Sequence, residues 1–271
     1  MKYKHGTVGL GILSWRGHKS LRLALDSYLD RDFFALFDEG MIFLPDPDKY
    51  VRAVADEYPL RIETSPENKG IMAGMEEIAN RLETDYIFFT ENDNPLLENR
   101  VESKRQIEKA LDLLHDDTAC MARMRHIKHP GDKFTTLHKY KWMHPTPDNF
   151  VGKLRRAFRP AKARRVSGTA IYAEDYPDQR FPDSIQNVGD GFYLVDADTL
   201  PWTNQSILIK RSFFIETILP YCKENPSNRT ANGFPTLEIE LNRSKFWLRS
   251  GWKIACGPGL LTHERVNDRG Y

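Results

Sequence analysis

The sequence of 271 residues has few cysteines, no long apolar run and almost no excess of charge. Its three cysteines, Cys120, Cys222 and Cys256, are too few and too scattered for a disulfide framework, which predicts a reducing, cytoplasmic location. No run approaches the roughly 18 apolar residues of a spanning helix, and the polar N-terminus does not resemble a signal peptide. A net charge of +1 gives no overall attraction to nucleic acid. We therefore expect a soluble protein whose contact with a membrane, where present, is peripheral.

Apolar runs and helical periodicity alternate along residues 1–125. Buried strands are predicted at 7–14, 41–44, 60–63, 86–90 and 119–124. Between them, apolar spacing predicts helices beginning near residue 20 and near residue 50, and over 71–82 and 101–114, with Leu29, Tyr50 and Val101 on apolar faces. Strands separated by such helices predict an α/β fold, in which a mostly parallel, mixed sheet is covered on both faces. Ligands of such sheets lie beyond the carboxyl ends of the strands.

The alternation stops over 126–190, which is rich in His, Pro, Arg and Lys and is expected to be an irregular basic insertion or lid. Its basic runs, 153–156 and 162–165, would cover an anionic ligand, contact an anionic acceptor or membrane surface, or form a solvated loop. Over 191–271 we expect strands at 191–195, 206–209, 252–256 and 260–262, and helices over 213–221 and 237–249. These residues would complete the same domain.

Two acids one residue apart, Glu91 and Asp93, follow the predicted strand 86–90, and Pro95 prevents the strand from continuing. Alternation along an extended backbone points both side chains the same way, at the ligand edge of the sheet. Oxygen ligands there suit Mg²⁺ or Mn²⁺, which bind a diphosphate with few protein carboxylates. An ordinary acidic turn would explain the same residues equally well.

Five short segments together carry a family resemblance: 12–16, 68–70, 91–93, 237–240 and 261–265. In this order they resemble the GT-A glycosyltransferases, especially the family 2-like group, over the first 125 residues and, less fully, over roughly the last 70. The resemblance implies a GT-A-like enzyme that moves a sugar from a nucleotide diphosphate, with UDP preferred, to a hydroxyl of a glycan or another acceptor. Residues 1–125 would then bind the nucleotide sugar, and 191–271 would form the acceptor-side and catalytic half.

The resemblance also implies individual roles at the sheet edge. Asp93 and His263, with Glu91, would bind Mn²⁺ or Mg²⁺. The donor nucleotide would lie against Ser14, Arg16, Asp46, Asn68, Gly70, Glu91 and Asn92. Simpler explanations exist for several of these residues, since Asp46 would equally cap the next helix, Asn68 would form a turn and Arg16 would be a solvated arginine.

Glu238 and Glu240 are the candidate catalytic bases, because inverting transfer needs one carboxylate to take the proton of the acceptor hydroxyl. Thr236 is expected to cap their helix. Two positions apart on a helix, the two acids face different directions, so one of them would be the base, and position favours Glu238. Both would otherwise be first-turn acids that the helix dipole favours. A retaining mechanism remains open.

Trp202 and Asn204 are predicted to contact the acceptor sugar, although a buried Trp with polar neighbours would look the same in sequence. Two other functions share the fold. A sugar nucleotidyltransferase would carry a Gly-rich phosphate loop after the first strand, which residues 14–18 do not supply well. A non-catalytic nucleotide or sugar binder would keep the cleft without the base.

Overall fold

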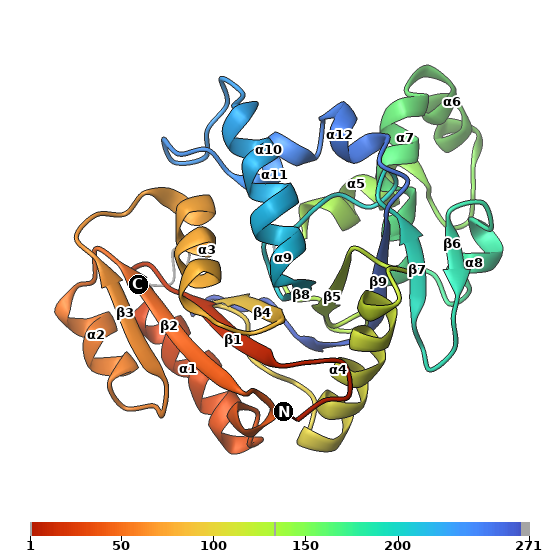
Figure 1. Ribbon diagram of the computed structural model, residues 1–271. Helices are drawn as coiled ribbons and strands as arrows, with labels where there is room; N and C mark the ends of the chain where they lie inside the picture. Colours follow the sequence, from red (N-terminus) through yellow and green to blue (C-terminus); the bar gives the residue numbers. More distant parts are fainter. Residues whose placement is uncertain (1, 133, 267–271) are drawn as a thin grey trace.

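The computed structural model describes residues 2–132 and 134–266, and within these ranges nine strands form one mixed sheet between layers of helices (Figure 1). The sheet order is β3-β2-β1-β4-β8-β5-β9-β7-β6. The strands are β1 (Val8–Leu13), β2 (Glu39–Pro45), β3 (Arg61–Ser65), β4 (Tyr86–Glu91), β5 (Met121–Arg125), β6 (Ile185–Asn187), β7 (Tyr193–Asp196), β8 (Ile207–Lys210) and β9 (Lys253–Leu261).

The four N-terminal strands are parallel, so their carboxyl ends meet at one edge. Strand β8 then enters antiparallel between β4 and β5, and β5 pairs parallel with β9. Antiparallel β7 and β6 complete the far side. The α/β fold with a mixed sheet is therefore confirmed, and its parallel half carries the ligand edge.

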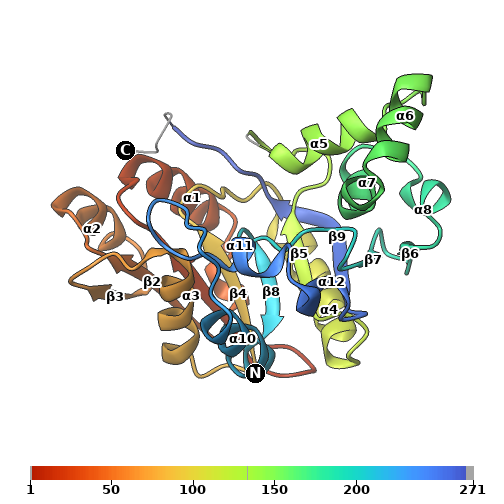
Figure 2. The same cartoon turned by 90° about the horizontal axis from the view of Figure 1, so that it is seen from above.

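Helices cover both faces of the sheet (Figure 1; Figure 2). One layer holds α1 (His18–Asp30), α2 (Lys49–Ala55) and α4 (Arg100–His115). The other holds α3 (Gly70–Arg81) with the run α9 (Arg211–Phe213), η3 (Phe214–Ile218) and α10 (Leu219–Glu224). In β4, Phe88 packs on the first layer while Ile87 and Phe89 pack on the second, as the two-residue period of a strand requires.

The glycines of β1 serve helix packing. A Cβ on Gly11 would lie 2.3 Å from Ile78 Cγ2 of α3, so glycine lets that helix approach the strand closely. Gly9 and Gly11 both lie inside β1, where they cannot form a phosphate-binding turn.

Residues 126–190 are more regular than the sequence indicated, and they hold four short α-helices and β6 among the residues described. The helices are α5 (Thr135–Met143), α6 (Phe150–Phe158), α7 (Pro160–Ser167) and α8 (Pro177–Arg180), with the 3₁₀ turn η2 (Gly168–Tyr172) after α7. Short helices separated by prolines offer too few turns for an apolar period to be recognised. Within the described ranges, no helix has the length and apolar character needed to cross a membrane.

Several expected boundaries and faces differ from those observed. The helix expected over 237–249 is two short ones, α11 (Leu237–Leu241) and α12 (Lys245–Leu248), and the strands expected at 252–256 and 260–262 are the single strand β9. Leu29, Tyr50 and Val101 are exposed rather than buried. Each lies in the first or last turn of its helix.

Candidate functional site

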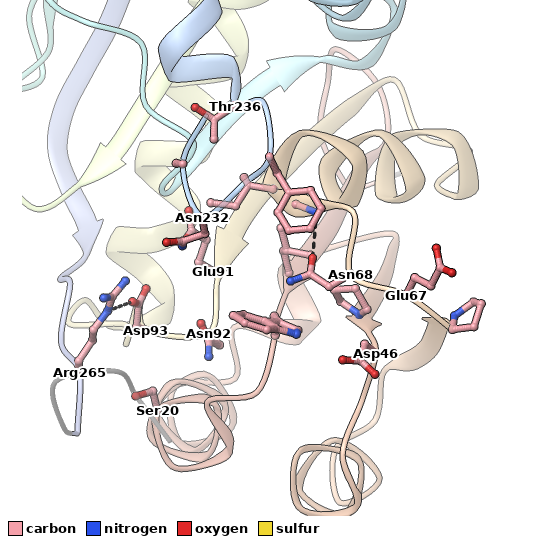
Figure 3. A pocket seen from close by; sticks show the side chains of 18 residues that line it. Ser20, Asp46, Glu67, Asn68, Glu91, Asn92, Asp93, Asn232, Thr236 and Arg265 are labelled. Atoms are coloured by element: carbon pink, nitrogen blue, oxygen red, sulfur yellow. Dashed lines mark hydrogen bonds and ion pairs between the residues drawn. The ribbon is translucent and has the colours of Figure 1, made fainter. Parts of the chain in front are cut away.

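A cleft of about 890 Å³ opens at the carboxyl edge of strands β1 to β4. Its floor comes from the loops after these strands, and residues of the 231–236 segment, which precedes α11, close it from the other side. Figure 3 shows two ends, with Asp46 and Asn68 at one and Asp93 and Arg265 at the other. Glu91 lies between them.

At the first end, Asp46 lies just after β2 and lines the cleft. Arg16 Nη2 donates to Asp46 Oδ2 at 3.2 Å. The side chain that caps α2 is Asp48, which accepts from two backbone N–H groups, so Asp46 has no capping role. Asn68 Oδ1 accepts from Gly70 N at 2.9 Å, and it therefore forms the turn that opens α3.

Trp15 also lines this end, and the Arg16 guanidinium carbon lies 5.1 Å from the centre of its ring. Ser14, by contrast, is buried behind the cleft, and its hydroxyl has no hydrogen-bond partner among the described residues.

Gly70 and the 231–236 segment meet across the cleft. Gly70 has φ +87°, and a Cβ there would lie 2.5 Å from Phe234 Cβ. Thr236 caps α11 as expected, since its hydroxyl accepts from Ile239 N at 3.2 Å. The segment is thus fixed by the helix on one side and by contact with α3 on the other.

The second end is built by the chain after β9, which runs beside the loop after β4. Thr262 N donates to Pro95 O at 3.0 Å, and Glu264 N donates to Asp93 O at 2.9 Å. His263 and Arg265 both reach the Asp93 side chain: His263 Nε2 lies 3.1 Å and Arg265 Nε 2.7 Å from Asp93 Oδ2. Two residues 170 positions apart in the sequence, Asp93 and His263, therefore share one buried site.

The tautomer of His263 follows from its other nitrogen. Nδ1 lies 2.9 Å from the carbonyl oxygen of Asp132, which can only accept, so Nδ1 carries the proton. A Cβ on Gly131 would lie 2.0 Å from His263 O, so only glycine allows this loop so close. In the neutral ring Nε2 then carries no proton, and its lone pair faces the Asp93 carboxylate. Nε2 has no hydrogen-bond partner among the described residues. A cation bound between Nε2 and Asp93 Oδ2 would remove the repulsion between the lone pair and the carboxylate.

Three carboxyl groups of the site have shifted pKa values. Burial, reinforced by the charges of Asp93 and Glu238, raises the pKa of Glu91 to about 8, so Glu91 is largely protonated at neutral pH. Burial also raises the pKa of Glu238 above its ordinary value. Burial would raise the pKa of Asp93 too, but its contacts with His263 and Arg265 outweigh this and hold the pKa below the usual range.

Asp93 and His263 are the pair that could hold a divalent cation. Two ligands on adjacent octahedral positions, each about 2.1 Å from an ion, lie about 3.0 Å apart, close to the observed 3.1 Å. Across 2–132 and 134–266, no three His, Cys, Asp or Glu side chains group closely enough to hold a metal ion by themselves. Any such ion would therefore need ligands from a bound molecule or from water.

The two candidate bases lie in different environments. Glu238 Oε1 accepts from Asn204 N at 3.3 Å. The charge of Glu238 also raises the pKa of Glu91, so Glu238 lies near Glu91 and the Asp93 end of the cleft. Glu240 is buried and accepts from Ser227 N at 2.8 Å and from Ser227 Oγ at 3.0 Å, which is a structural contact.

Trp202 lies outside the cleft. Its ring is 2% exposed and packs edge-on against Trp247 at 5.3 Å between centroids, so it presents no free face for a sugar. Its Nε1 donates to Asn204 Oδ1 at 3.0 Å, which orients the segment whose backbone contacts Glu238.

Sequence reasoning missed the contributions of Trp15, Phe234, Asp132 and Arg265. The last is the clearest case. His263 and Arg265 are two positions apart on an extended segment, so their side chains point the same way. This spacing could have indicated that both contact the same residue.

Comparison with known proteins supports the architecture. No known family's sequence profile matches the chain, and no curated protein sequence matches it either. Its fold resembles that of a mannosyltransferase from Pyrobaculum calidifontis solved with GDP-Man and Mn²⁺, with a TM-score of 0.50 at 12% identity over 100% of this chain and 60% of that one. It also resembles S. aureus TarS 1–349 solved with UDP-GlcNAc, with a TM-score of 0.50 at 10% identity over 97% of this chain and 60% of that one.

The chain thus spans about three fifths of the length of both solved chains. At these identities the likeness concerns the fold. The chain has the GT-A-like α/β fold of these glycosyltransferases.

Proposed function

We propose that the protein is a metal-dependent glycosyltransferase that moves a sugar from a nucleotide-diphosphate sugar, with UDP preferred, to a hydroxyl of a glycan or similar acceptor. The observation that carries this proposal is the contact between Asp93 Oδ2 and His263 Nε2 at one end of a cleft wide enough for a nucleotide sugar. The nucleotide sugars bound to the two solved proteins of similar fold, one of them with Mn²⁺, support it.

Asp93 and His263 would hold Mn²⁺ or Mg²⁺. Such an ion, when bound, neutralises the charge that develops on the leaving diphosphate. The protein's part is to fix its two ligands: the Asp132 carbonyl sets the His263 tautomer, and the backbone bond from Glu264 to Asp93 sets the spacing. Arg265 would donate to the diphosphate once it leaves Asp93, because a guanidinium suits phosphate oxygens.

The nucleoside would occupy the other end of the cleft. Asp46 would accept the imide N–H of uracil, and Arg16 would hold its carboxylate in place. Trp15 would pack against the base or ribose, while Asn68 and Gly70 would line the approach to the diphosphate. Asn92 lines the floor between the two ends.

Glu238 would take the proton of the attacking hydroxyl in an inverting reaction. A raised pKa suits a general base at neutral pH, and Asn204 N keeps one carboxylate oxygen oriented. Glu91, largely protonated, would donate a hydrogen bond within the same site. In this arrangement residues 1–125 hold the nucleoside, His263 and Arg265 join Asp93 at the diphosphate, and the second half of the chain supplies the base and meets the acceptor.

The test is calorimetric titration of UDP, GDP and their sugars with and without Mn²⁺, on wild-type protein and on Asp93→Ala. We expect one nucleotide to bind in a Mn²⁺-dependent way and the variant to lose that dependence. Asp190→Ala, which changes an exposed acid paired with Lys109, is the control and should bind as the wild type does. Metal-dependent turnover that survives Asp93→Ala would show that the assigned site is wrong.

A turnover assay on the same protein, with nucleotide sugars or with nucleoside triphosphates and sugar phosphates as substrates, separates the alternatives. A sugar nucleotidyltransferase would instead consume a nucleoside triphosphate with a sugar phosphate and release pyrophosphate. A non-catalytic binder would show nucleotide binding but neither donor hydrolysis nor transfer.

A further inference from the structure

Helix α6 carries an unusually exposed apolar face. Phe150 is 77% and Phe158 78% exposed, and Val151 and Leu154 are exposed as well. Residues 150, 154 and 158 follow one another at helical spacing, with 151 beside them, so all four lie on one side of the helix. We call these four residues the α6 patch. Single exposed apolar residues are common on protein surfaces, but a continuous stripe with two open phenylalanine rings indicates an interaction surface.

The outward direction of this face is fixed by the opposite face of the helix. Gly152 is buried, and a Cβ there would lie 2.7 Å from Pro145 Cγ. Arg156 donates to Met143 O at 2.9 Å and to both carboxylate oxygens of Asp148. These contacts hold the polar side against the protein, so the patch cannot turn inward without breaking them.

The segment that carries the patch is rich in basic residues, and three of them lie close to a single exposed ring. Trp142, 41% exposed at the end of α5, has Arg155 at 4.4 Å, Lys162 at 5.2 Å and Arg159 at 5.9 Å from its ring centre. Between Phe134 and Ala173 the sequence has one acid, Asp148. Over the same stretch it has nine basic residues: Lys139, Lys141, Lys153, Arg155, Arg156, Arg159, Lys162, Arg164 and Arg165.

The location of α6 leaves it accessible. In Figure 1 and Figure 2 the helix lies at the end of the molecule opposite α2 and β3. The insertion that carries it begins beside the cleft, since Asp132, just before α5, contacts His263. The segment that carries the patch is therefore joined to the His263 side of the cleft.

We propose that the α6 patch binds an anionic lipid bilayer, with Phe150, Leu154 and Phe158 entering the interface and the surrounding Lys and Arg side chains meeting the headgroups. An apolar stripe flanked by basic residues is the composition of helices that lie in a membrane interface. Anionic headgroups attract such basic clusters, whereas a second copy of this chain would bring one strongly basic surface against another. Membrane binding here does not depend on the proposed transfer reaction.

The test is flotation of the full chain with vesicles of phosphatidylcholine alone or mixed with phosphatidylglycerol. We expect binding to the anionic vesicles that weakens as salt is raised, because salt screens the basic residues. Phe150→Ser with Phe158→Ser should reduce partitioning by about tenfold or more. Lys153→Gln with Arg159→Gln should reduce it by roughly fivefold per side chain, and only on anionic vesicles.

Val101→Ser is the matched control, since Val101 is 79% exposed on α4, outside this basic segment, and its loss should leave partitioning unchanged. The exposed positions of the substituted residues predict that every variant keeps the wild-type melting temperature and nucleotide binding. Failure to bind anionic vesicles, or equal binding by the double Phe variant, would overturn the proposal. If the protein does not bind vesicles but its mass in solution rises with concentration, and the double Phe variant abolishes that rise, the patch would instead serve self-association.

Discussion

Arg265 Nε lies 2.7 Å from Asp93 Oδ2, the carboxylate oxygen that a divalent cation would need. The same oxygen is 3.1 Å from His263 Nε2. In this arrangement the Arg265 guanidinium supplies the positive charge beside Asp93, at the second end of the cleft. A metal ion and Arg265 should therefore compete for Asp93, unless Arg265 moves to the diphosphate that arrives with the ion.

Arg265→Gln is expected to strengthen Mn²⁺ binding in the absence of nucleotide. The partly exposed Asp93–Arg265 contact is worth up to about 1 kcal/mol, so its removal should lower the Kd for Mn²⁺ by about fivefold. With a nucleotide diphosphate present, the gain in Mn²⁺ affinity should shrink or reverse, because the variant lacks the guanidinium that would donate hydrogen bonds to the diphosphate. Calorimetric titration of Mn²⁺ measures both cases. Arg16→Gln, at the other end of the cleft, should leave Mn²⁺ binding without nucleotide unchanged, and an unchanged Kd in Arg265→Gln would contradict the competition.

Glu238→Gln and Glu240→Gln should separate catalysis from stability. Removal of a general base lowers kcat by roughly 10²–10⁴-fold, and we expect this loss for Glu238→Gln with little change in melting temperature. Glu240→Gln weakens the contacts with Ser227 and should lower the free energy of unfolding by about 1–2 kcal/mol, with kcat nearly unchanged. Steady-state kinetics and urea unfolding give the two readouts. The reverse pattern would move the base to Glu240.

The parallel half of the fold could be predicted because its signals are local. Strand β4 is an apolar run that ends at Glu91, and the turn at Asn68 opens α3 where the helical spacing begins. Parallel strands that share an edge bring such ends together whatever lies between them. The proximity of Asp93 and His263 followed from the family resemblance, and the distance between them agrees with it. Their metal-binding role stays a prediction.

The other half depended on contacts that sequence patterns do not carry. Helix α6 is nine residues long and exposes its apolar face, so a search for buried periodicity does not find it. Trp202 was open to two interpretations, and only its packing against Trp247 distinguishes them. The position of Arg265 depends on hydrogen bonds between residues 93–95 and 262–264, which arise from tertiary structure alone.

Gly70→Ala and Gly233→Ala test how tightly the 231–236 segment packs against the start of α3. Both glycines have positive φ, +87° and +84°, so alanine introduces a similar backbone strain of about 1–2 kcal/mol at each. A Cβ at residue 233 meets nothing within 4 Å among the described residues, whereas one at residue 70 would lie 2.5 Å from Phe234 Cβ. We expect Gly70→Ala to lose about 1–3 kcal/mol more in urea unfolding and to bind nucleotide more weakly. Equal losses in the two variants would mean that Phe234 moves freely.

His144 should make the stability of the insertion depend on pH. Its Nε2 donates to Ala163 O at 3.1 Å and so joins the end of α5 to α7. Burial lowers the pKa of His144 below its ordinary value, and the nearby Arg156 and Arg180 act in the same direction, although the bond to Ala163 opposes them. The native state therefore binds fewer protons than the unfolded chain below about pH 6.5, and stability must fall as the pH falls through that range. Urea unfolding between about pH 7 and 5 should show a smaller loss for His144→Gln than for wild type. His138→Gln changes an exposed histidine of α5 and is the control; this variant should follow the wild-type curve.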